Sequence, residues 1–221
     1  GYLSMTLRNR NYEREIKNEI ILLLKNKYLY LSIVFFIITT SLNSYSQVYL
    51  YNFNEKNGPL PVLSDLVLDN IPYKEVSFIY DWASVLSLVL FCVFILHKRK
   101  FKEIPYFFIL FSFFYLIRSL TIVLTPIGNP PNFEGSKSIF KGFTNYEYGV
   151  YPSGHTGSAF TYTLISNGIY RLLFIISLIL TITSLFLTKG HYSIDVLSGI
   201  IFSYAIYSFS EKYLKSRIMK G

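Results

Sequence analysis

The sequence is dominated by apolar runs that are long enough to cross a lipid bilayer as helices. The clearest runs cover residues 28–50, 76–96, 104–125, 170–188 and 191–209. A transmembrane helix needs about 20 mostly apolar residues. Only 15% of the 221 residues are charged, whereas about 25% is usual in soluble domains. These runs predict an all-α, polytopic membrane protein.

A further, weaker run begins near His155 and carries many small and hydroxyl side chains over residues 156–168. Small residues in transmembrane helices normally mark packing against other helices rather than contact with lipid. We therefore expect a bundle of six transmembrane helices, whose fourth and sixth members form the interior. The expected segments are a basic N-terminal segment over 1–27, the six-helix membrane domain over 28–210 and a basic tail over 211–221.

Basic residues at the ends of the runs predict the orientation of this bundle. Six spans place the following residues on one side: Arg8, Arg10, Arg14, Lys17, Lys25, Lys27, Lys98, Arg99, Lys100, Lys102, Arg171, Lys212, Lys215, Arg217 and Lys220. The main loops on the other side, 51–75 and 126–154, hold Glu55, Asp65, Asp69, Glu75, Glu134 and Glu147 against four lysines. Because loops rich in lysine and arginine stay in the cytoplasm, we expect both termini to be cytoplasmic.

The distribution of charge argues against binding of nucleic acid, and the cysteine content excludes an internal disulfide. A formal net charge of +8 would suit nucleic acid, but the basic residues gather at the ends of apolar runs instead of alternating with exposed aromatic residues. Cys92 is the only cysteine, which rules out a disulfide within the chain. We therefore expect a membrane and no nucleic acid among the partners.

His191 and Asp195 are ionisable residues at the start of the last run. They lie four residues apart, so a helix would place them on one face. A carboxylate beside an imidazole fixes its tautomer and raises its basicity, which suits a histidine that attacks an electrophile or accepts a proton. Ionisable residues at membrane depth are costly and usually functional. The alternative is a structural pair that caps the helix end in interfacial water.

A polar stripe follows the run over 104–125. Its residues recur at spacings of three, three and four, which is one helical face: Tyr115, Arg118, Thr121 and Thr125. The planar guanidinium of Arg118 matches the oxygens of a phosphate, so the stripe predicts a phosphate or headgroup cleft. The alternative is a packed helix whose arginine extends to the membrane surface.

The motif PSGHT at residues 152–156 predicts a turn at the mouth of the fourth span. Pro152 and Gly154 bend the backbone, and Ser153 with nearby N–H groups can face an anion, as helix N-termini do. His155 would then reach a leaving-group oxygen on the same side of the membrane as His191. The alternative is an ordinary helix cap by Ser153, with His155 in interfacial water.

The two histidines also allow a metal site as an alternative interpretation. His155, His191 and Asp195 would supply three zinc ligands. The third histidine of the chain, His97, lies in the basic cluster on the opposite side and cannot join them. Arg118 would repel a cation and attract an anion, so we expect a site without a metal or another cofactor.

These motifs, in this order, resemble the type 2 phosphatidic acid phosphatase superfamily and, within it, the sphingomyelin synthase branch. The patterns of that branch are Y-x-x-R-x-x-T-x-x-x-T-P, S-G-H-T and H-Y-[ST]-x-D-V, and the matching residues are Tyr115, Arg118, Thr121, Thr125, Pro126, 153–156 and 191–196. PLPVLSDLVLDNIP is also similar to signals that follow the first helix of the branch, with Ser64 where proline is usual. The resemblance covers about residues 28–210.

The chain departs from the family patterns at two places. The branch has C-G-D before S-G-H-T, and this chain has Glu147, Tyr148 and Gly149 there. The phosphatases have an arginine six residues before the second histidine, where this chain has Leu185. The second departure argues against an ordinary lipid phosphatase, and the first leaves the headgroup open.

The resemblance implies a metal-free phosphohistidine mechanism that transfers a phospho-headgroup from a glycerophospholipid donor to a lipid alcohol, ceramide or diacylglycerol. In this mechanism His191, activated by Asp195, attacks phosphorus, and His155 protonates the departing oxygen. The residues expected at the phosphate and headgroup are Arg118, Tyr115, Thr121, Ser153, Gly154 and Tyr192. The membrane domain would be catalytic, with its site on the non-cytoplasmic side, whether periplasmic, lumenal or extracellular.

Two alternatives to a transferase stay open. A hydrolase, either a lipid phosphatase or a phospholipase C, would use the same residues with water as the acceptor. A non-catalytic lipid-binding or transport protein would keep the fold without turnover. The intact pair of His191 and Asp195 argues against this second alternative.

Overall fold

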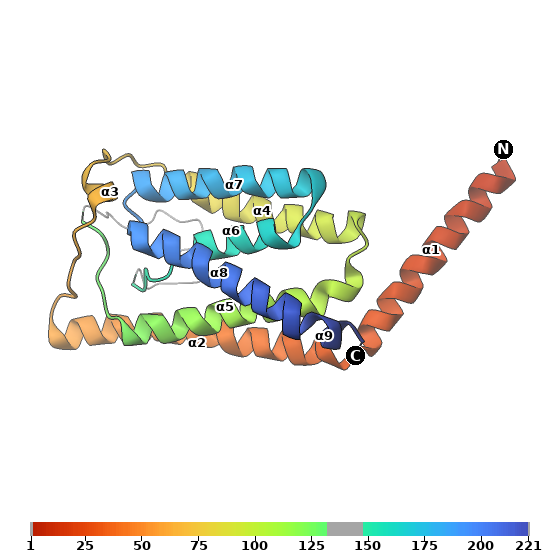
Figure 1. Ribbon diagram of the computed structural model, residues 1–221, viewed down its shortest axis with the longest axis horizontal. Helices are drawn as coiled ribbons and strands as arrows, with labels where there is room; N and C mark the ends of the chain where they lie inside the picture. The colour runs from red at the N-terminus through yellow and green to blue at the C-terminus, as the bar shows by residue number, and fades with distance from the viewer. Residues whose placement is uncertain (1, 132–147, 221) are drawn as a thin grey trace.

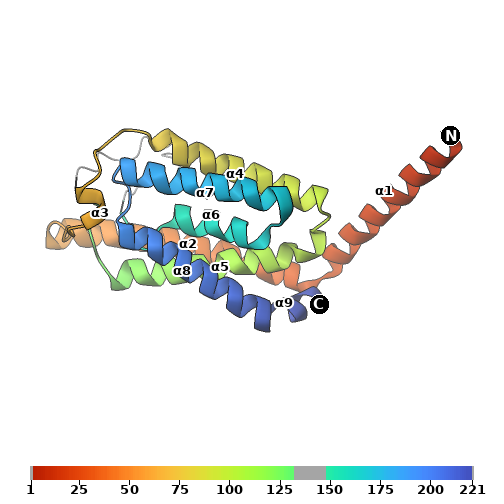
Figure 2. The same cartoon turned by 45° about the horizontal axis from the view of Figure 1, so that its top comes forward.

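The computed structural model describes residues 2–131 and 148–220, and over these residues it contains helices and no strand. The long helices run side by side in one bundle, and α1 projects away from it (Figures 1 and 2). Two acidic residues used in the orientation argument, Glu134 and Glu147, lie outside the described residues.

The helices of the described chain, in order, are α1 (Tyr2–Lys25), α2 (Lys27–Asn57), α3 (Leu66–Asp69), α4 (Ser77–His97), the 3-10 turn η1 (Phe101–Glu103), α5 (Ile104–Leu124), α6 (Gly154–Ile165), α7 (Gly168–Leu187), α8 (Ser193–Tyr213) and α9 (Lys215–Lys220). The long helices alternate in direction along the bundle (Figure 1), and α2 packs mainly on α5, α4 on α7, and α6 on both α7 and α8. We call the end of the bundle where α1 meets α2 and where α9 lies the terminal end. The opposite end, which carries α3, is the loop end (Figure 1).

Five helical segments of the described chain are long and apolar enough to cross a membrane. They are α2, α4, α7, α8 and the segment Phe101–Leu124 that contains α5, with mean hydropathies between 1.3 and 2.2. Large apolar side chains such as Ile37, Leu86 and Ile179 point outward and are more than half exposed. The structure therefore agrees with the prediction of an all-helical, multi-pass membrane protein.

The expected fourth span is shorter than predicted. It forms α6, which has 12 residues and a length of about 18 Å, too short to cross a bilayer by itself. Residues 148–152 are not helical, Ser153 caps α6, and the helix ends where Ser166 and Asn167 link it to α7. Six full spans are therefore not confirmed, because the described chain has five candidate spans of 20 to 31 residues and α6 has only 12.

The expectation that the fourth and sixth spans form the interior is right for one of them. Every residue of α6 is buried or half-buried. One face of α8 packs on α6, but Ile194, Leu197 and Ile201 on α8 are about half exposed, so this helix also forms part of the outer surface. Ser198, Gly199 and Ser203 lie on its buried face, whereas Ala205 and Ser208 are exposed.

Glycine makes the close contact between α6 and α8 possible. A Cβ atom on Gly199 would lie 2.9 Å from the backbone oxygen of Ser153 and 3.2 Å from the backbone nitrogen of Gly157. A Cβ atom on Gly157 would in turn lie 2.0 Å from Cζ of Phe114 on α5. The start of α6 is therefore held between α5 and α8 with no room for a side chain at either glycine.

Candidate active site

Ser153 begins α6 and connects it to α8. Its hydroxyl accepts a hydrogen bond from the N–H of Thr156 at 3.2 Å, which caps the helix. Its own N–H donates to the carbonyl of Asp195 at 3.0 Å, and the residue is fully buried. Ser153 therefore caps α6, as the alternative interpretation of the PSGHT motif expected. This cap fixes His155 beside the first turn of α8.

Arg118 lies on α5 and holds the chain that leads into α6. Its Nε donates to the carbonyl of Pro152 at 3.0 Å and its Nη2 to the carbonyl of Gly149 at 2.6 Å. Its Nη1 donates to Oδ1 of Asn43 on α2 at 2.6 Å. A guanidinium carries five N–H groups, so these three bonds leave two N–H groups for another acceptor.

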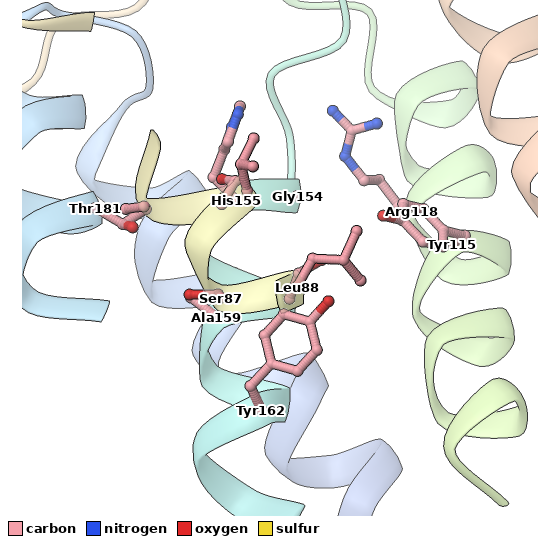
Figure 3. A pocket seen from close by; sticks show the side chains of 13 residues that line it. Ser87, Leu88, Tyr115, Arg118, Gly154, His155, Ala159, Tyr162 and Thr181 are labelled. Carbon is pink, nitrogen blue, oxygen red and sulfur yellow. The ribbon is translucent and has the colours of Figure 1, made fainter. Parts of the chain in front are cut away.

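Gly154 allows the guanidinium of Arg118 to lie against the start of α6. A Cβ atom at Gly154 would be 3.2 Å from Nε of Arg118. Figure 3 shows that the guanidinium and the imidazole of His155 extend toward the same end of a cavity. The positive charge of Arg118 and the imidazole of His155 therefore line the same part of the cavity.

The imidazole of His155 lies between two other rings. Its centroid is 5.0 Å from the ring of Tyr80 on α4 and 6.0 Å from the imidazole of His191. Both contacts are edge-to-face. Residues from α4, from the start of α6 and from the connection before α8 therefore meet at one point near the loop end.

His191 and Asp195 form the expected pair, although His191 precedes α8 and only Asp195 is within its first turn. Nδ1 of His191 lies 3.4 Å from Oδ2 of Asp195, which is longer than a usual hydrogen bond of about 2.9 Å. The same oxygen accepts the N–H of Tyr192 at 2.8 Å, and Asp195 is fully buried. With Nδ1 directed at the carboxylate, Nε2 is the nitrogen left for a substrate.

A cavity of about 530 Å³ adjoins Arg118, Gly154 and His155 and lies between α4, α5, α6 and α7. This volume is within the range of about 300–1,000 Å³ that is usual for small-molecule sites. Arg118 and His155 are at one end and Tyr162 is at the other (Figure 3). Leu88 on α4 lines the cavity and is 54% exposed, so the cavity reaches the outer flank of the bundle. One polar end and an apolar body suit an amphipathic ligand.

The remaining predicted headgroup residues differ in their places. Tyr115 lines the cavity. The hydroxyl of Thr121 has only backbone oxygens as acceptors in reach among the described hydrogen bonds, those of Arg118 at 2.9 Å, Ile117 at 3.0 Å and Tyr151 at 3.3 Å. The structure therefore brings His155, Arg118, Gly154 and Tyr115 to the cavity. It places His191 next to His155 and Asp195 next to His191, although neither of the two lines the cavity. Ser153 and Thr121 support the backbone.

Tyr192 likewise faces the loops and not the cavity. Its ring is 1% exposed, and its hydroxyl donates to the carbonyl of Asn129 at 3.2 Å and accepts the N–H of Leu63 at 3.1 Å. It joins the start of α8 to two loops that are distant in the sequence. Its contacts are those of a residue that positions its neighbour His191.

Asp65 is a supporting residue that sequence reasoning missed. Its carboxylate caps α3 by accepting the N–H groups of Val67 at 2.9 Å and Leu68 at 3.1 Å, and it also accepts the N–H of Ser193 at 2.6 Å. Burial raises the pKa of Asp65, but the hydrogen bonds from these N–H groups outweigh burial, so its pKa lies below the ordinary value. An acidic residue before a short apolar stretch is a cap signal, but the sequence gives no sign of the bond to Ser193.

Lys189 approaches the same connection from its other side. It is 6% exposed, and its ammonium donates to the backbone oxygens of Leu68 and Ile71 at the end of α3. The short helix α3 therefore holds the chain two residues before and two residues after His191. No pattern in the sequence predicted this role of Lys189.

Among the described residues, no three His, Cys, Asp or Glu side chains lie close enough together to hold a metal ion. The zinc alternative, with ligands from His155, His191 and Asp195, is therefore not formed by their arrangement here. The described site consists of the guanidinium of Arg118 and the imidazole of His155 at the polar end of the cavity, with His191 next to His155 and Asp195 next to His191.

Comparison of the chain with protein-family models, with curated proteins and with solved structures gave no match.

Proposed function

We propose that the chain is a membrane lipid phosphotransferase, which moves a phospho-headgroup from a glycerophospholipid to a lipid alcohol such as a ceramide or a diacylglycerol. The observation that carries the proposal is the pair of imidazoles of His155 and His191, 6.0 Å apart between ring centroids. Asp195 lies behind His191, and Arg118 lines the same cavity as His155. The order of the motifs in the sequence, which resembles that of the sphingomyelin synthase branch, supports the same chemistry.

In the first step, Nε2 of His191 attacks the phosphorus of the donor lipid. An N–P bond forms, the bond between phosphorus and the diacylglycerol oxygen breaks, and His155 gives its proton to that oxygen. Asp195 holds Nδ1 of His191 and stabilises the positive charge that develops on the ring. The negative phosphate between the rings and Arg118 favours the proton on His155 before transfer.

In the second step, the lipid alcohol takes the place of the diacylglycerol. His155 accepts the proton of the alcohol, whose oxygen attacks phosphorus as the N–P bond breaks. His191 returns to its starting state, so the protein is unchanged over the cycle. Two displacements of this kind are the pattern of covalent catalysis by a nucleophile with a neighbouring acid–base group.

Arg118 has two tasks in the proposed reaction. Its bonds to Pro152 and Gly149 fix the segment that carries His155. Because Arg118 also lines the cavity, its remaining N–H groups would stabilise charge on the phosphate oxygens, a contribution that is usually among the largest in catalysis.

We further propose that the loop end faces away from the cytoplasm and that α6 counts as a sixth, partial traversal. With α6 counted as a traversal beside the five candidate spans, the two ends of the described chain would lie on the same side of the membrane. The basic residues Lys98, Arg171 and Lys212 belong to the terminal end. Support for this orientation comes from the general retention of basic loops in the cytoplasm.

The test is an assay of the purified full chain with headgroup-labelled phospholipids, with and without ceramide. A panel with choline, ethanolamine, inositol and glycerol headgroups identifies the donor. Label that moves to ceramide supports the transferase. Label released into water at the same rate with and without ceramide would overturn it in favour of a hydrolase, and retained lipid binding without turnover would favour the non-catalytic alternative.

A further inference from the structure

A second cavity, of about 300 Å³, lies at the terminal end of the bundle, far from the two histidines. Three elements meet around it: the end of α1, the turn η1 and the end of α9. Its lining consists of Leu22, Leu23, Lys25, Asn26, Lys102, Met219 and Lys220. Three lysines and no carboxylate therefore surround one hollow.

The acidic residues near this cavity are already paired with other bases. Arg99 forms ion pairs with Glu15 at 3.0 Å and Glu19 at 2.9 Å. Glu103 pairs with Lys100 and Lys215.

The second carboxylate partner of Lys215 is Glu211, at 2.7 Å. Within the described part of the chain, Lys25, Lys102 and Lys220 have no carboxylate partner. Three like charges around one hollow repel one another unless an anion lies between them.

The walls of the cavity are fixed to one another. The pairs of Arg99 with Glu15 and Glu19 hold α1 against the connection between α4 and η1. Nδ2 of Asn26 donates to the carbonyl of Ile218 at 3.0 Å, which joins the junction of α1 and α2 to α9. The three lysines are thus carried by elements with a defined relative position.

Apolar side chains adjoin the lysines on one side. Leu22 lines the cavity and is 54% exposed, and its neighbours Ile21 and Leu24 are also exposed. A helix with an apolar face and a basic face at the end of a membrane bundle lies at the surface of the bilayer. The cavity therefore sits where headgroups and hydrocarbon meet, and its volume suits a phosphate-bearing headgroup whose acyl chains lie along Leu22.

We infer that this cavity is a binding site for an anionic phospholipid, whose phosphate is held by Lys25, Lys102 and Lys220. Basic pockets beside transmembrane helices bind the headgroups of anionic lipids in this way. The site is separate from the proposed catalytic residues and would anchor α1 and α9 to the membrane surface. It does not depend on what reaction, if any, occurs at the loop end.

The test measures lipids that remain bound to the purified full chain, by native mass spectrometry after addition of phosphatidylglycerol or phosphatidylcholine. We expect one phosphatidylglycerol to be retained in preference to phosphatidylcholine. Replacement of the three lysines together, K25Q, K102Q and K220Q, should weaken this retention by about tenfold or more.

A matched control removes the same charge from the same end but outside the cavity: K17Q, K98Q and K212Q. Unchanged retention in the control supports the site. Equal loss in the control, or no loss in the cavity variant, would overturn it, because retention would then follow net charge or other residues. Displacement of the lipid by an equal concentration of inorganic phosphate would also overturn it, since the cavity would then recognise the phosphate alone.

Discussion

The imidazole rings of His155 and His191 are 6.0 Å apart, but their surroundings differ. His191 has the carboxylate of Asp195 at 3.4 Å from its Nδ1, whereas His155 lies against the ring of Tyr80 and shares the cavity with Arg118. A carboxylate favours the histidine that becomes positively charged when it forms a covalent bond. This asymmetry assigns the nucleophile to His191 and the proton transfers to His155.

The first prediction tests this division. H191A should abolish both turnover and the acid-labile labelled phosphoprotein, because no nucleophile remains. H155A should reduce turnover by about 10²–10⁴-fold, the usual contribution of an acid–base group, while the phosphoprotein still forms slowly. Rapid quenching and gel detection of the label separate the two. H97A is the control, since His97 contacts Tyr170 at the opposite end, and phosphoprotein in H191A would reverse the assignment.

The second prediction concerns the carboxylate of Asp195. D195N keeps the size of the side chain and an oxygen that can accept the N–H of Tyr192, but it removes the charge that faces His191. We expect kcat to fall by about 100-fold with little change in KM. S198A, a change on the same helix, is the control and should retain activity. Equal kcat in D195N and the unchanged protein would show that the charge does not assist His191.

The third prediction is a pH dependence of stability that arises from Asp65. Its folded-state pKa lies below the ordinary value of 3.8, so its charged form stabilises the fold fully above that pH. This contribution is lost only as the pH falls through the lower folded-state pKa. At neutral pH the protein should therefore have a higher Tm than D65N, and the difference should shrink below about pH 4.

Asp69 provides the matched control for Asp65, because it is on the same short helix and accepts only the N–H of Asp65, at 3.3 Å, among the described hydrogen bonds. D69N should change Tm less than D65N at neutral pH. A difference between D65N and the unchanged protein that persisted at full size in acid would contradict the role of the charge.

The fourth prediction concerns the packing of α6. G157A should lower Tm by about 5–10 °C, since the new methyl group would overlap the ring of Phe114 and overpacking of a core costs about 1–3 kcal/mol. F114L in the same chain should restore part of this loss by removing the ring. Thermal unfolding in detergent measures both. S158A, at a half-buried neighbour, is the control, and a G157A protein as stable as the control would disprove the contact.

The sequence was sufficient to predict the helices but not how deep each one extends. Apolar runs predicted α2, α4, α5, α7 and α8, because the cost of burying polar backbone in lipid makes such runs helical. The start of α6 depends on the cap at Ser153 and on the segment that Arg118 holds. These contacts join residues that are distant in the sequence, and no local pattern specifies them.

The candidate site was predictable in its residues and less so in their contacts. His191 and Asp195 were paired correctly because their spacing is local. Tyr115 and Arg118 of the stripe on α5 line a cavity, but Thr121 turns to backbone oxygens. The support that Lys189 receives from α3 arises only after the loops fold together, so composition and spacing could not indicate it.

The short length of α6 determines the depth at which the proposed reaction would occur. Helices α6 and α7 share the connection at Ser166 and Asn167, and they have 12 and 20 residues, so α6 begins about 12 Å before the loop end of α7. A lipid entering sideways past Leu88 would meet His155 with its chains still in the hydrocarbon. Turnover would then follow the mole fraction of each lipid within the membrane plane rather than its amount per volume of solution.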